Sequence, residues 1–261
     1  MHRIKFKQIE YKAGITVEVI KCMPGKKGRG DRKTTPEEIA EANMRQAARK
    51  LARKINANFK PGDWHVVLMY KSDSRPDPEQ AQKNIKKLLD GLRDRYKKNG
   101  FVLKYIHVTE YYKKAIHHHL IINNVNDGKK TTTEYIRELW KGDGKGSKHF
   151  TSLYEDGEYR KLADYFIKET EKTFRDSNSP FKQRYSCSRN LINPKPQCRT
   201  RETKSGWKLE PKPRPGYYID PESLYNGTDR LGRPYQRYVM IKLNPTEADW
   251  EPCAGFPDTG D

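Results

Sequence analysis

The chain has 261 residues, enough for one large domain or for one domain with a sizeable appendage. Its 53 lysines and arginines outnumber 34 acidic residues, and the net charge of +19 is accompanied by 16 tyrosines, so phosphates and bases of a nucleic acid are suitable partners. The four cysteines form no C-x-x-C pair and no run of about 18 apolar residues occurs, which argues against a zinc knuckle, a redox pair or a membrane span and favours a cytoplasmic protein with reduced thiols.

The N-terminal part begins with an expected hairpin and a basic loop. Residues 3–21 alternate weakly between apolar and polar side chains around an Ala-Gly pair, which is typical of a β-hairpin. A glycine-rich basic loop follows at 24–33. The next segment has Thr35 as a candidate N-cap, Pro36 in the first turn and an apolar stripe at helical spacing, so it predicts a helix.

The middle of the chain alternates between expected strands and helices. A short apolar strand is expected at 63–71, and a helix follows it with Pro78 in the first turn and Gly100 at its end. The segments 101–112 and 115–124 are typical of two strands. These strands must be antiparallel, because the connection between them is too short for a crossover.

Three further segments complete the expected main domain. Helices are predicted at 131–140 and 157–174, and residues 148–155 between them can form a strand. Helices on a mainly antiparallel sheet indicate an α/β (α+β) fold. The sequence therefore predicts an RRM-like or palm sheet with flanking helices and a basic C-terminal arm.

The character of the chain changes after Phe174. Residues 175–216 combine many prolines with many cations, so this segment is either an ordered arm held against the domain or a disordered tail that orders on its partner. The segment 235–243 looks like one more strand. We expect three parts: an N-terminal hairpin and basic loop at 1–34, the main domain at 35–174, and a proline-rich basic arm at 175–261.

Three consecutive histidines lie on the second of the two middle strands. Because alternate side chains of a strand share a face, His117 and His119 point the same way and His118 points to the opposite face. Two imidazoles on one face can bind one divalent ion from the same side. His118 is expected to pack against a helix instead.

A third metal ligand depends on the register between the two strands. With a two-residue turn, Glu110 faces His117, and with a four-residue loop it faces His119. A loop of odd length would bring His107 and Thr109 to that face instead. Two imidazoles and one carboxylate leave open positions on an ion, and this mixed set accepts Mn²⁺ or Mg²⁺ as well as zinc.

A tyrosine among lysines stands on the helix expected at 157–174. The core-facing stripe of this helix consists of Tyr159, Leu162, Phe166 and Thr170. Tyr165 lies off that stripe, and its neighbours at helical spacing are Lys161, Lys168 and Lys172. Nearby cations favour the charged phenolate, which could attack a phosphate. The alternative is an amphipathic tyrosine at the rim of the core.

Together the two groups of residues resemble the HUH endonucleases, a superfamily named for two histidines around one bulky residue. The histidine motif matches at 117–119, and Tyr165 with Lys168 matches the nucleophile helix of the form Tyr-x-x-Lys. The strand at 64–70 looks like the first motif of the superfamily, although Met69 replaces the usual threonine.

One branch of this superfamily is the most similar. Residues 109–111, Thr-Glu-Tyr, stand before the histidine strand, and "RYSCSRNL" at 184–191 follows the tyrosine helix. Both features resemble the rolling-circle replication-associated (Rep) proteins of the bacterial and filamentous-phage type. The resemblance extends over roughly residues 60–195.

This resemblance implies a replication initiator that nicks single-stranded DNA at an origin. Glu110, His117 and His119 would hold Mn²⁺ or Mg²⁺ beside the scissile phosphate. Tyr165 would attack the phosphorus and stay joined to the 5′ phosphate, which frees a 3′ hydroxyl, and the reverse reaction would religate the strand. Lys168 would position the phosphate or stabilise the phenolate.

The resemblance also suggests the partners. Four cations would grip the DNA backbone: Lys161, Lys172, Arg184 and Arg189. Tyr70 is a candidate for stacking on a base. The expected partners are single-stranded DNA or an origin hairpin, and a host helicase and polymerase, since the chain has no Walker-type nucleotide-binding loop.

Other functions stay open from the sequence alone. An RRM-like protein that binds single-stranded nucleic acid without catalysis would expose aromatic side chains on its sheet and be indifferent to metal. A metal-dependent nuclease that activates water would leave Tyr165 with a structural role. A relaxase or transposase of the same superfamily would share the chemistry.

Overall fold

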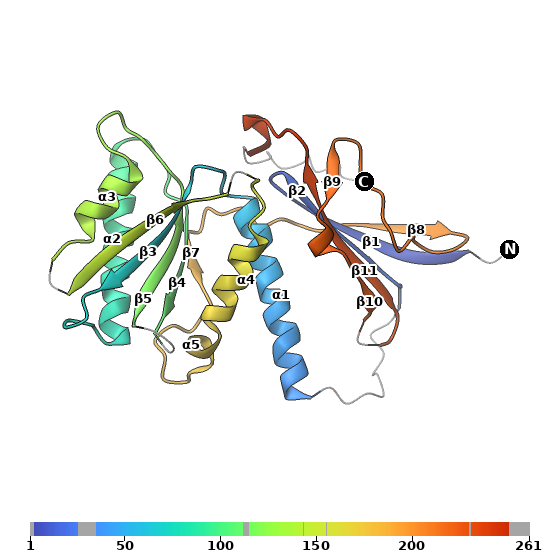
Figure 1. Cartoon of the computed structure of the whole chain (residues 1–261), viewed down its shortest axis with the longest axis horizontal. Helices are drawn as coiled ribbons and strands as arrows, with labels where there is room; N and C mark the ends of the chain where they lie inside the picture. The colour runs from blue at the N-terminus through green and yellow to red at the C-terminus, as the bar shows by residue number, and fades with distance from the viewer. Residues whose placement is uncertain are drawn as a thin grey trace. The chain divides into compact units, whose positions relative to one another are not determined.

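The structure, a computed structural model, describes residues 3–25, 35–111, 115–142, 144–154, 156–229 and 231–250. The internal contacts divide the chain into two compact units. Unit 1 consists of Met1–Asn43, Arg53–Ala57 and Ile192–Asp261, and unit 2 consists of Met44–Ala52 and Asn58–Leu191. Figure 1 labels the helices and strands of both.

Unit 2 is built on an antiparallel sheet with the strand order β6-β3-β5-β4-β7 (Figure 1). Its strands are β3 (Trp64–Tyr70), β4 (Tyr105–Glu110), β5 (His117–Ile122), β6 (Lys145–Ser152) and β7 (Ser186–Cys187). Helix α2 (Pro78–Lys98) joins β3 to β4, and α3 (Thr132–Leu139) joins β5 to β6. This β-α-β-β-α-β order with antiparallel neighbours is the arrangement of RRM-like sheets. The predicted α+β fold class is confirmed.

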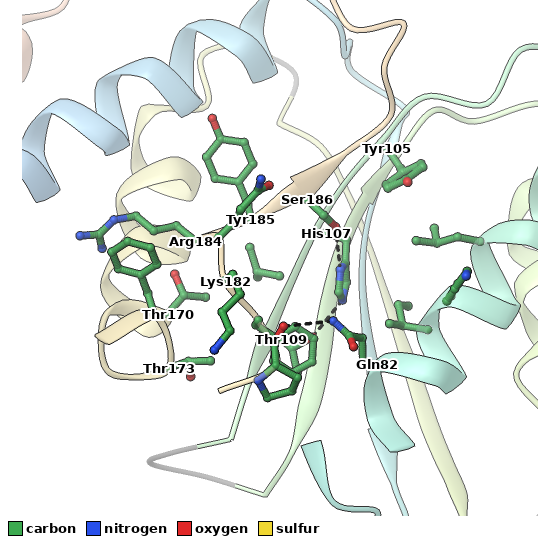
Figure 2. Close-up of a pocket in the computed structure, with 18 of the residues that line it drawn as sticks. Gln82, Tyr105, His107, Thr109, Thr170, Thr173, Lys182, Arg184, Tyr185 and Ser186 are labelled. Carbon is green, nitrogen blue, oxygen red and sulfur yellow. Dashed lines mark hydrogen bonds between the residues drawn. The ribbon is translucent and has the colours of Figure 1, made fainter. Parts of the chain in front are cut away.

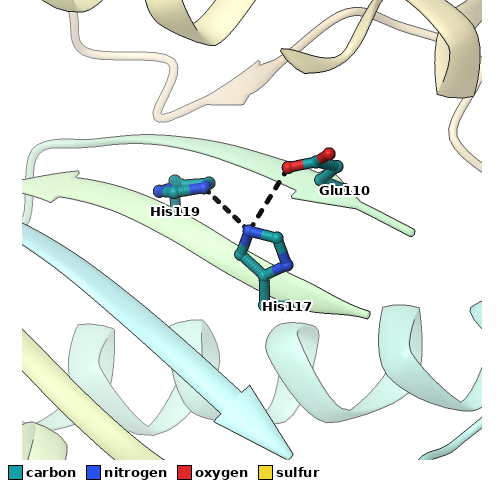
Figure 3. Close-up of side chains that lie close together, drawn as sticks. All are labelled: Glu110, His117 and His119. Atoms are coloured by element: carbon teal, nitrogen blue, oxygen red, sulfur yellow. Dashed lines mark hydrogen bonds and ion pairs between the residues drawn. The ribbon is translucent and has the colours of Figure 1, made fainter. Parts of the chain in front are cut away.

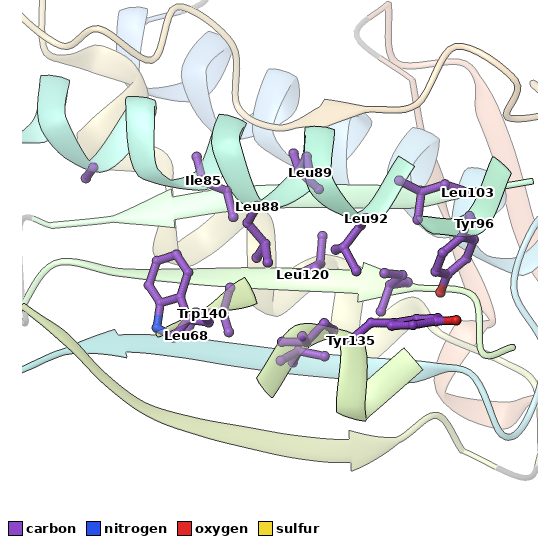
Figure 4. Packing of buried hydrophobic residues seen from close by; sticks show 14 of the residues in the cluster. Leu68, Ile85, Leu88, Leu89, Leu92, Tyr96, Leu103, Leu120, Tyr135 and Trp140 are labelled. Carbon is purple, nitrogen blue, oxygen red and sulfur yellow. The ribbon is translucent and has the colours of Figure 1, made fainter. Parts of the chain in front are cut away.

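One face of this sheet packs against α2 and α3 (Figure 4). Alternate residues of β3 and β5 point to this face, so Leu68 and Leu120 are fully buried. Helix α2 begins after Asp77, whose carboxylate accepts a hydrogen bond from a first-turn amide, with Pro78 at the first helical position. Its apolar stripe, as predicted, is buried on the sheet: Ile85, Leu88, Leu89 and Leu92.

The opposite face of the sheet contacts α4 (Arg160–Glu169). The Phe166 ring lies 5.4 Å from the ring of His65 on β3 and 5.5 Å from that of His119 on β5, measured between centroids. The predicted core stripe of this helix is confirmed, since its members are buried: Tyr159, Leu162, Phe166 and Thr170.

Three element boundaries differ from those predicted. Strand β4 begins only at Tyr105, and β6 begins at Lys145, earlier than expected. The helix predicted at 157–174 is divided at Thr170 into α4 and α5 (Glu171–Arg175). The Thr170 hydroxyl donates to the Phe166 carbonyl at 2.7 Å, and such a bond to the preceding turn competes with the regular helix.

Unit 1 contains a second antiparallel sheet with the order β10-β11-β2-β1-β8, and β9 pairs with β11. The predicted N-terminal hairpin is confirmed as β1 (Ile4–Ala13) and β2 (Thr16–Cys22). The other strands come from the C-terminal arm: β8 (Gln197–Thr203), β9 (Tyr217–Ile219), β10 (Tyr225–Thr228) and β11 (Pro234–Lys242). The strand expected at 235–243 is therefore β11, and the arm is ordered over the residues that the structure describes.

The remaining helices are α1 (Pro36–Asn56) and two short 3₁₀ helices, η1 (Pro221–Ser223) and η2 (Glu247–Trp250). Helix α1 begins as predicted, because Thr35 and Glu38 form a reciprocal capping box. Its residues are divided between the two units. Among the described helices, none has both the length and the apolar character that a membrane span requires.

Candidate metal centre and nucleophile helix

The register between β4 and β5 decides which side chain joins the histidines. Glu110 pairs with His117, and Val108 pairs with His119. This is the register that a two-residue turn gives, although residues 112–114 of the connection lie outside the described residues. Because directly paired residues share a face, Glu110 and not Thr109 lies beside the two imidazoles.

Glu110, His117 and His119 form a compact set of potential metal ligands (Figure 3). One ligand atom from each lies within 4.8 Å of the others. His117 Nε2 is 3.1 Å from His119 Nε2 and 3.4 Å from Glu110 Oε2. All three side chains are buried, and Glu110 is 0 % exposed.

The separation of His117 from the other two ligand atoms fits a divalent ion. Neighbouring ligands about 2.1 Å from an ion in octahedral or tetrahedral geometry lie about 3.0–3.4 Å from each other. The separations of His117 Nε2 from His119 Nε2 and from Glu110 Oε2, 3.1 and 3.4 Å, fall in this range. Two imidazoles and a carboxylate could hold Mn²⁺ or Mg²⁺, and this donor set also suits zinc.

The second nitrogen of each of these histidines is held by another group. His117 Nδ1 lies 2.7 Å from the Ala115 carbonyl oxygen, which can only accept, so Nδ1 carries the proton and donates it. His119 Nδ1 lies 3.1 Å from His65 Nε2. Such outer partners fix the tautomer and the ring orientation of metal-binding histidines, and here they turn both Nε2 atoms toward Glu110.

His65 was not predicted as a site residue. It lies on β3, and its ring stacks on that of His119 at a centroid distance of 5.4 Å. Burial lowers the pKa of His65 to about 4, so the ring is neutral at pH 7 and its Nε2 can accept the His119 proton. The alternation of β3 could have revealed it, because His65 and Val67 share a face and Val67 pairs with His119.

Helix α4 places Tyr165 beside the same cluster. The Tyr165 ring is half-buried, and its centroid lies 5.4 Å from that of His119 at an interplanar angle of 87°. Burial raises the pKa of Tyr165, and the charges of Glu169 and Glu110 raise it further. The expectation that neighbouring lysines favour the phenolate is therefore wrong for the protein chain by itself. A cation bound beside Glu110 would oppose the effect of the Glu110 charge on the pKa of Tyr165.

The cations predicted to serve the site lie on α4 and on the segment that follows it. Lys161 and Lys168 are exposed on α4, Lys172 is exposed on α5, and Arg189 is exposed after β7. Arg184 is half-buried, forms an ion pair with Glu171, and lies over the ring of Phe174. Their contact with DNA stays a prediction.

The far face of β5 holds His118 in a polar network. His118 Nδ1 lies 2.8 Å from the Thr109 hydroxyl and 3.2 Å from His107 Nε2, and His118 Nε2 lies 2.9 Å from the Tyr70 hydroxyl. Burial holds the pKa of His118 well below its usual value. His118 thus faces away from the metal-ligand cluster, as predicted. Tyr70 is buried as well, so the suggestion that it stacks on a base is wrong.

One comparison with known families gives a match. Residues 63–174 match the family described as Replication-associated protein ORF2. The matched segment contains Glu110, His117, His119 and Tyr165. No curated protein and no solved structure matches the chain. The family match supports a Rep-type protein with a role in DNA replication.

Proposed function

We propose that this protein initiates rolling-circle replication by nicking single-stranded DNA at an origin, in the manner of the HUH endonucleases. The observation that carries the proposal is the convergence of four side chains on one sheet face. The ligand atoms of Glu110, His117 and His119 lie within 4.8 Å of one another, and the Tyr165 ring lies 5.4 Å from His119. The family match over the same residues supports a function in replication.

The reaction transfers a phosphoryl group of the DNA from a 3′ oxygen to the oxygen of Tyr165. When bound, Mn²⁺ or Mg²⁺ would polarise the scissile phosphate and offset the charge that builds on its oxygens. The Tyr165 phenol gives its proton to water, its oxygen bonds to phosphorus, the bond between phosphorus and the 3′ oxygen breaks, and the 3′ oxygen takes up a proton from water. The DNA keeps a free 3′ hydroxyl and the 5′ phosphate stays on Tyr165, and the reverse steps religate the strand. Lys168, on the next turn of α4, supplies a cation for the phosphate.

In this proposal His65 is a positioning residue. It accepts the Nδ1 proton of His119 and so keeps the Nε2 lone pair directed at the ion. The Ala115 carbonyl does the same for His117. The chain thereby aligns both imidazoles before DNA arrives.

The proposed partners follow from the reaction. Single-stranded DNA or an origin hairpin is the substrate, and its backbone is contacted by four cations: Lys161, Lys172, Arg184 and Arg189. A host helicase would separate the strands and a host polymerase would extend the 3′ hydroxyl.

Covalent capture of DNA tests the proposal. The full chain is incubated with Mn²⁺ and a random pool of single-stranded DNA, and denaturant-resistant adducts are isolated and mapped by mass spectrometry. We expect a nucleotide adduct on Tyr165 that EDTA prevents. Tyr165→Phe should form no adduct, while its affinity for single-stranded DNA in EDTA stays within about twofold of wild type, since one phenolic hydroxyl contributes little to backbone binding.

Two outcomes would contradict this assignment. An adduct formed by the Tyr165→Phe variant would place the nucleophile on another residue. Cleavage without any adduct in the wild-type protein would show that water attacks the phosphorus, which is the rival nuclease reaction.

A further inference from the structure

A cavity of about 470 Å³ is lined in part by His107 and Thr109 of β4, whose side chains point to the face opposite Glu110 (Figure 2). Its walls come from α2, β4, α5 and residues 180–186 of the segment that leads into β7. Cavities that bind small ligands typically measure about 300–1,000 Å³. Of the residues that line it, only Arg184 has a role in the proposed reaction, as a contact to the DNA backbone.

The β4 wall of the cavity is polar and internally satisfied. His107 Nδ1 lies 3.1 Å from the Ser186 hydroxyl, and His107 Nε2 lies 3.1 Å from the Thr109 hydroxyl (Figure 2). These groups bond to one another, so they hold the shape of the wall without a ligand.

The α5 wall carries a different kind of polar group. Thr173 is 2 % exposed, and its Oγ1 has no hydrogen-bond partner among the residues that the structure describes. Figure 2 shows this side chain among those that line the cavity. Burying a hydroxyl without a partner is costly. Because the Thr173 side chain lines the cavity, rotation about its Cα–Cβ bond would turn the hydroxyl toward a ligand there and give it a partner.

The rest of the lining combines rings with cations. Tyr105, Phe181 and Tyr185 contribute aromatic rings. The charged residues of the lining are one carboxylate, Asp90, and four cations: Lys86, Arg93, Lys182 and Arg184. Arg93 pairs with Asp90, whereas Lys86 and Lys182 form no ion pair within the described part of the chain. Rings and cations in one cavity suit a nucleotide, whose base can stack while its phosphate takes the charge.

A second cavity extends this basic surface. It has a volume of about 710 Å³, shares Arg93 and Tyr105 with the first, and is lined also by Lys97 and Arg189. Because Arg93 and Tyr105 line both, the two cavities adjoin along α2 and the β4–β7 edge of the sheet, and we refer to them together as the basic groove.

We propose that this groove binds single-stranded DNA and that the first cavity takes one of its nucleotides. The base lies against the aromatic rings and hydrogen-bonds to Thr173, and the phosphate lies toward Lys86 and Lys182. This inference rests on the proposed DNA substrate and does not require that the DNA be cleaved.

The topology allows one strand of DNA to reach both the cavity and the metal-ligand cluster. Thr109 lines the cavity and Glu110 belongs to the cluster, and the Cα atoms of neighbouring residues are about 3.8 Å apart. Their side chains point to opposite faces of the sheet. The described pairing of β7 with β4 covers Ile106 and His107 and so ends before Val108. A DNA strand that passes this edge of the sheet can contact both of its faces.

Binding and crosslinking in EDTA, where the proposed nicking cannot occur, test the inference. The probe is a 12-nucleotide single strand that contains iododeoxyuridine, used with the full chain. We expect photo-crosslinks to Tyr105, Phe181 or Tyr185. Thr173→Val should weaken binding roughly three- to tenfold through loss of one hydrogen bond. Thr173→Ser keeps the hydroxyl and should bind like wild type. The valine variant should fold, since it removes only a hydroxyl without a partner.

Competition with deoxynucleoside monophosphates distinguishes a nucleotide within a DNA strand from a free nucleotide as the ligand of the cavity. We expect the monophosphates to displace the 12-mer only at far higher concentration. A monophosphate that binds as tightly as the 12-mer would overturn the assignment to a DNA strand. Crosslinks confined to other surfaces, together with wild-type affinity of Thr173→Val, would overturn the cavity as a site. If DNA binding depends on Thr173 but the protein does not nick DNA, the inference about the cavity is supported and the proposed nicking reaction is contradicted.

Discussion

Histidines on the two faces of β5 have different surroundings: those on one face are candidate metal ligands, and the one on the other face is structural. His117, His118 and His119 are all buried, with 5 %, 0 % and 3 % exposure. His117 and His119 each have Nδ1 held by a neighbour and Nε2 turned toward Glu110. His118 has both nitrogens engaged within a polar network. Burial is common to all three, so the partners of the two ring nitrogens distinguish a candidate ligand from a structural histidine.

The difference extends to what covers each face. The His118 face is sealed by the rings of Tyr70 and Trp140, which lie 5.6 and 5.8 Å from the His118 ring. The other face meets α4 through Tyr165 and Phe166, and Tyr165 is only half-buried. We therefore expect substitutions on one face to change stability and substitutions on the other to change metal binding.

His118→Ala should destabilise the protein strongly. The substitution leaves a cavity beside Trp140 and removes hydrogen bonds from the Tyr70 and Thr109 hydroxyls. Lost packing and buried hydroxyls with fewer partners together should lower the free energy of unfolding by roughly 2–4 kcal/mol. Urea unfolding of the full chain measures this change. Mn²⁺ affinity of the folded variant should stay within about twofold, because the His118 ring lies on the far face.

The matched variant on the other face is His119→Ala. It should abolish Mn²⁺ binding and change stability less than His118→Ala does, since the ring that it removes is a proposed ligand. If His118→Ala weakened Mn²⁺ binding as much as His119→Ala, the proposal that only the His117 and His119 face of β5 binds metal would be refuted.

The alternation of a strand predicts this division from the sequence. Period two alone places His117 and His119 on one face and His118 on the other. Glu110 needed the register, which depends on a connection whose length the sequence leaves ambiguous, and the Glu110–His117 pairing decides it. The pKa of Tyr165 could not be predicted, because the sequence shows its lysine neighbours but not its burial or its distance from Glu110.

On the metal-ligand face, loss of the His65 imidazole should weaken metal binding. His65→Phe keeps a ring beside Phe166 but removes the acceptor for His119 Nδ1. Loss of such an outer partner typically weakens metal affinity about 10–100-fold. Titration of free Mn²⁺ by electron paramagnetic resonance measures the change in Kd.

The control is His65→Asn, whose amide oxygen can accept the same proton. It should recover part of the lost affinity, which a purely structural role of His65 would not predict. Equal Mn²⁺ affinity of His65→Phe and wild type would show that His119 is oriented without its neighbour.

Long-range pairing explains most of what the sequence did not reveal. Strand β8 is exposed along its whole length and carries Arg199 and Arg201, so it lacks the apolar alternation that marks a strand. It pairs with β1, almost 200 residues earlier in the chain, for example Phe6 with Arg201. Thr173 likewise has no sequence signal, because a buried hydroxyl without a partner is visible only when its surroundings are known.

The smallest expected effect is a pH dependence of stability that arises on the His118 face. Burial lowers the pKa of His107 to about 3, against about 6.5 for an exposed histidine. The other titratable groups around it are His118 on β5 and those that line the cavity: Lys86, Asp90, Arg93, Tyr105, Lys182, Arg184 and Tyr185. Because the unfolded chain binds a proton that the folded chain excludes, the stabilising effect of neutral His107 is complete above pH 6.5 and is lost as pH falls toward 3.

Urea unfolding in EDTA at several pH values measures this loss of stability at low pH. Between pH 7.5 and 5, His107 should account for a decrease of about 1–2 kcal/mol in the free energy of unfolding. His107→Gln cannot titrate there, so its stability should fall less steeply over this range even though it starts lower. His149→Gln changes an exposed histidine on β6 and should keep the wild-type slope. If the free energy of unfolding of His107→Gln depended on pH as steeply as that of wild type, His107 would bind a proton in the folded protein. The hydrogen bonds around His118 would then not exclude that proton.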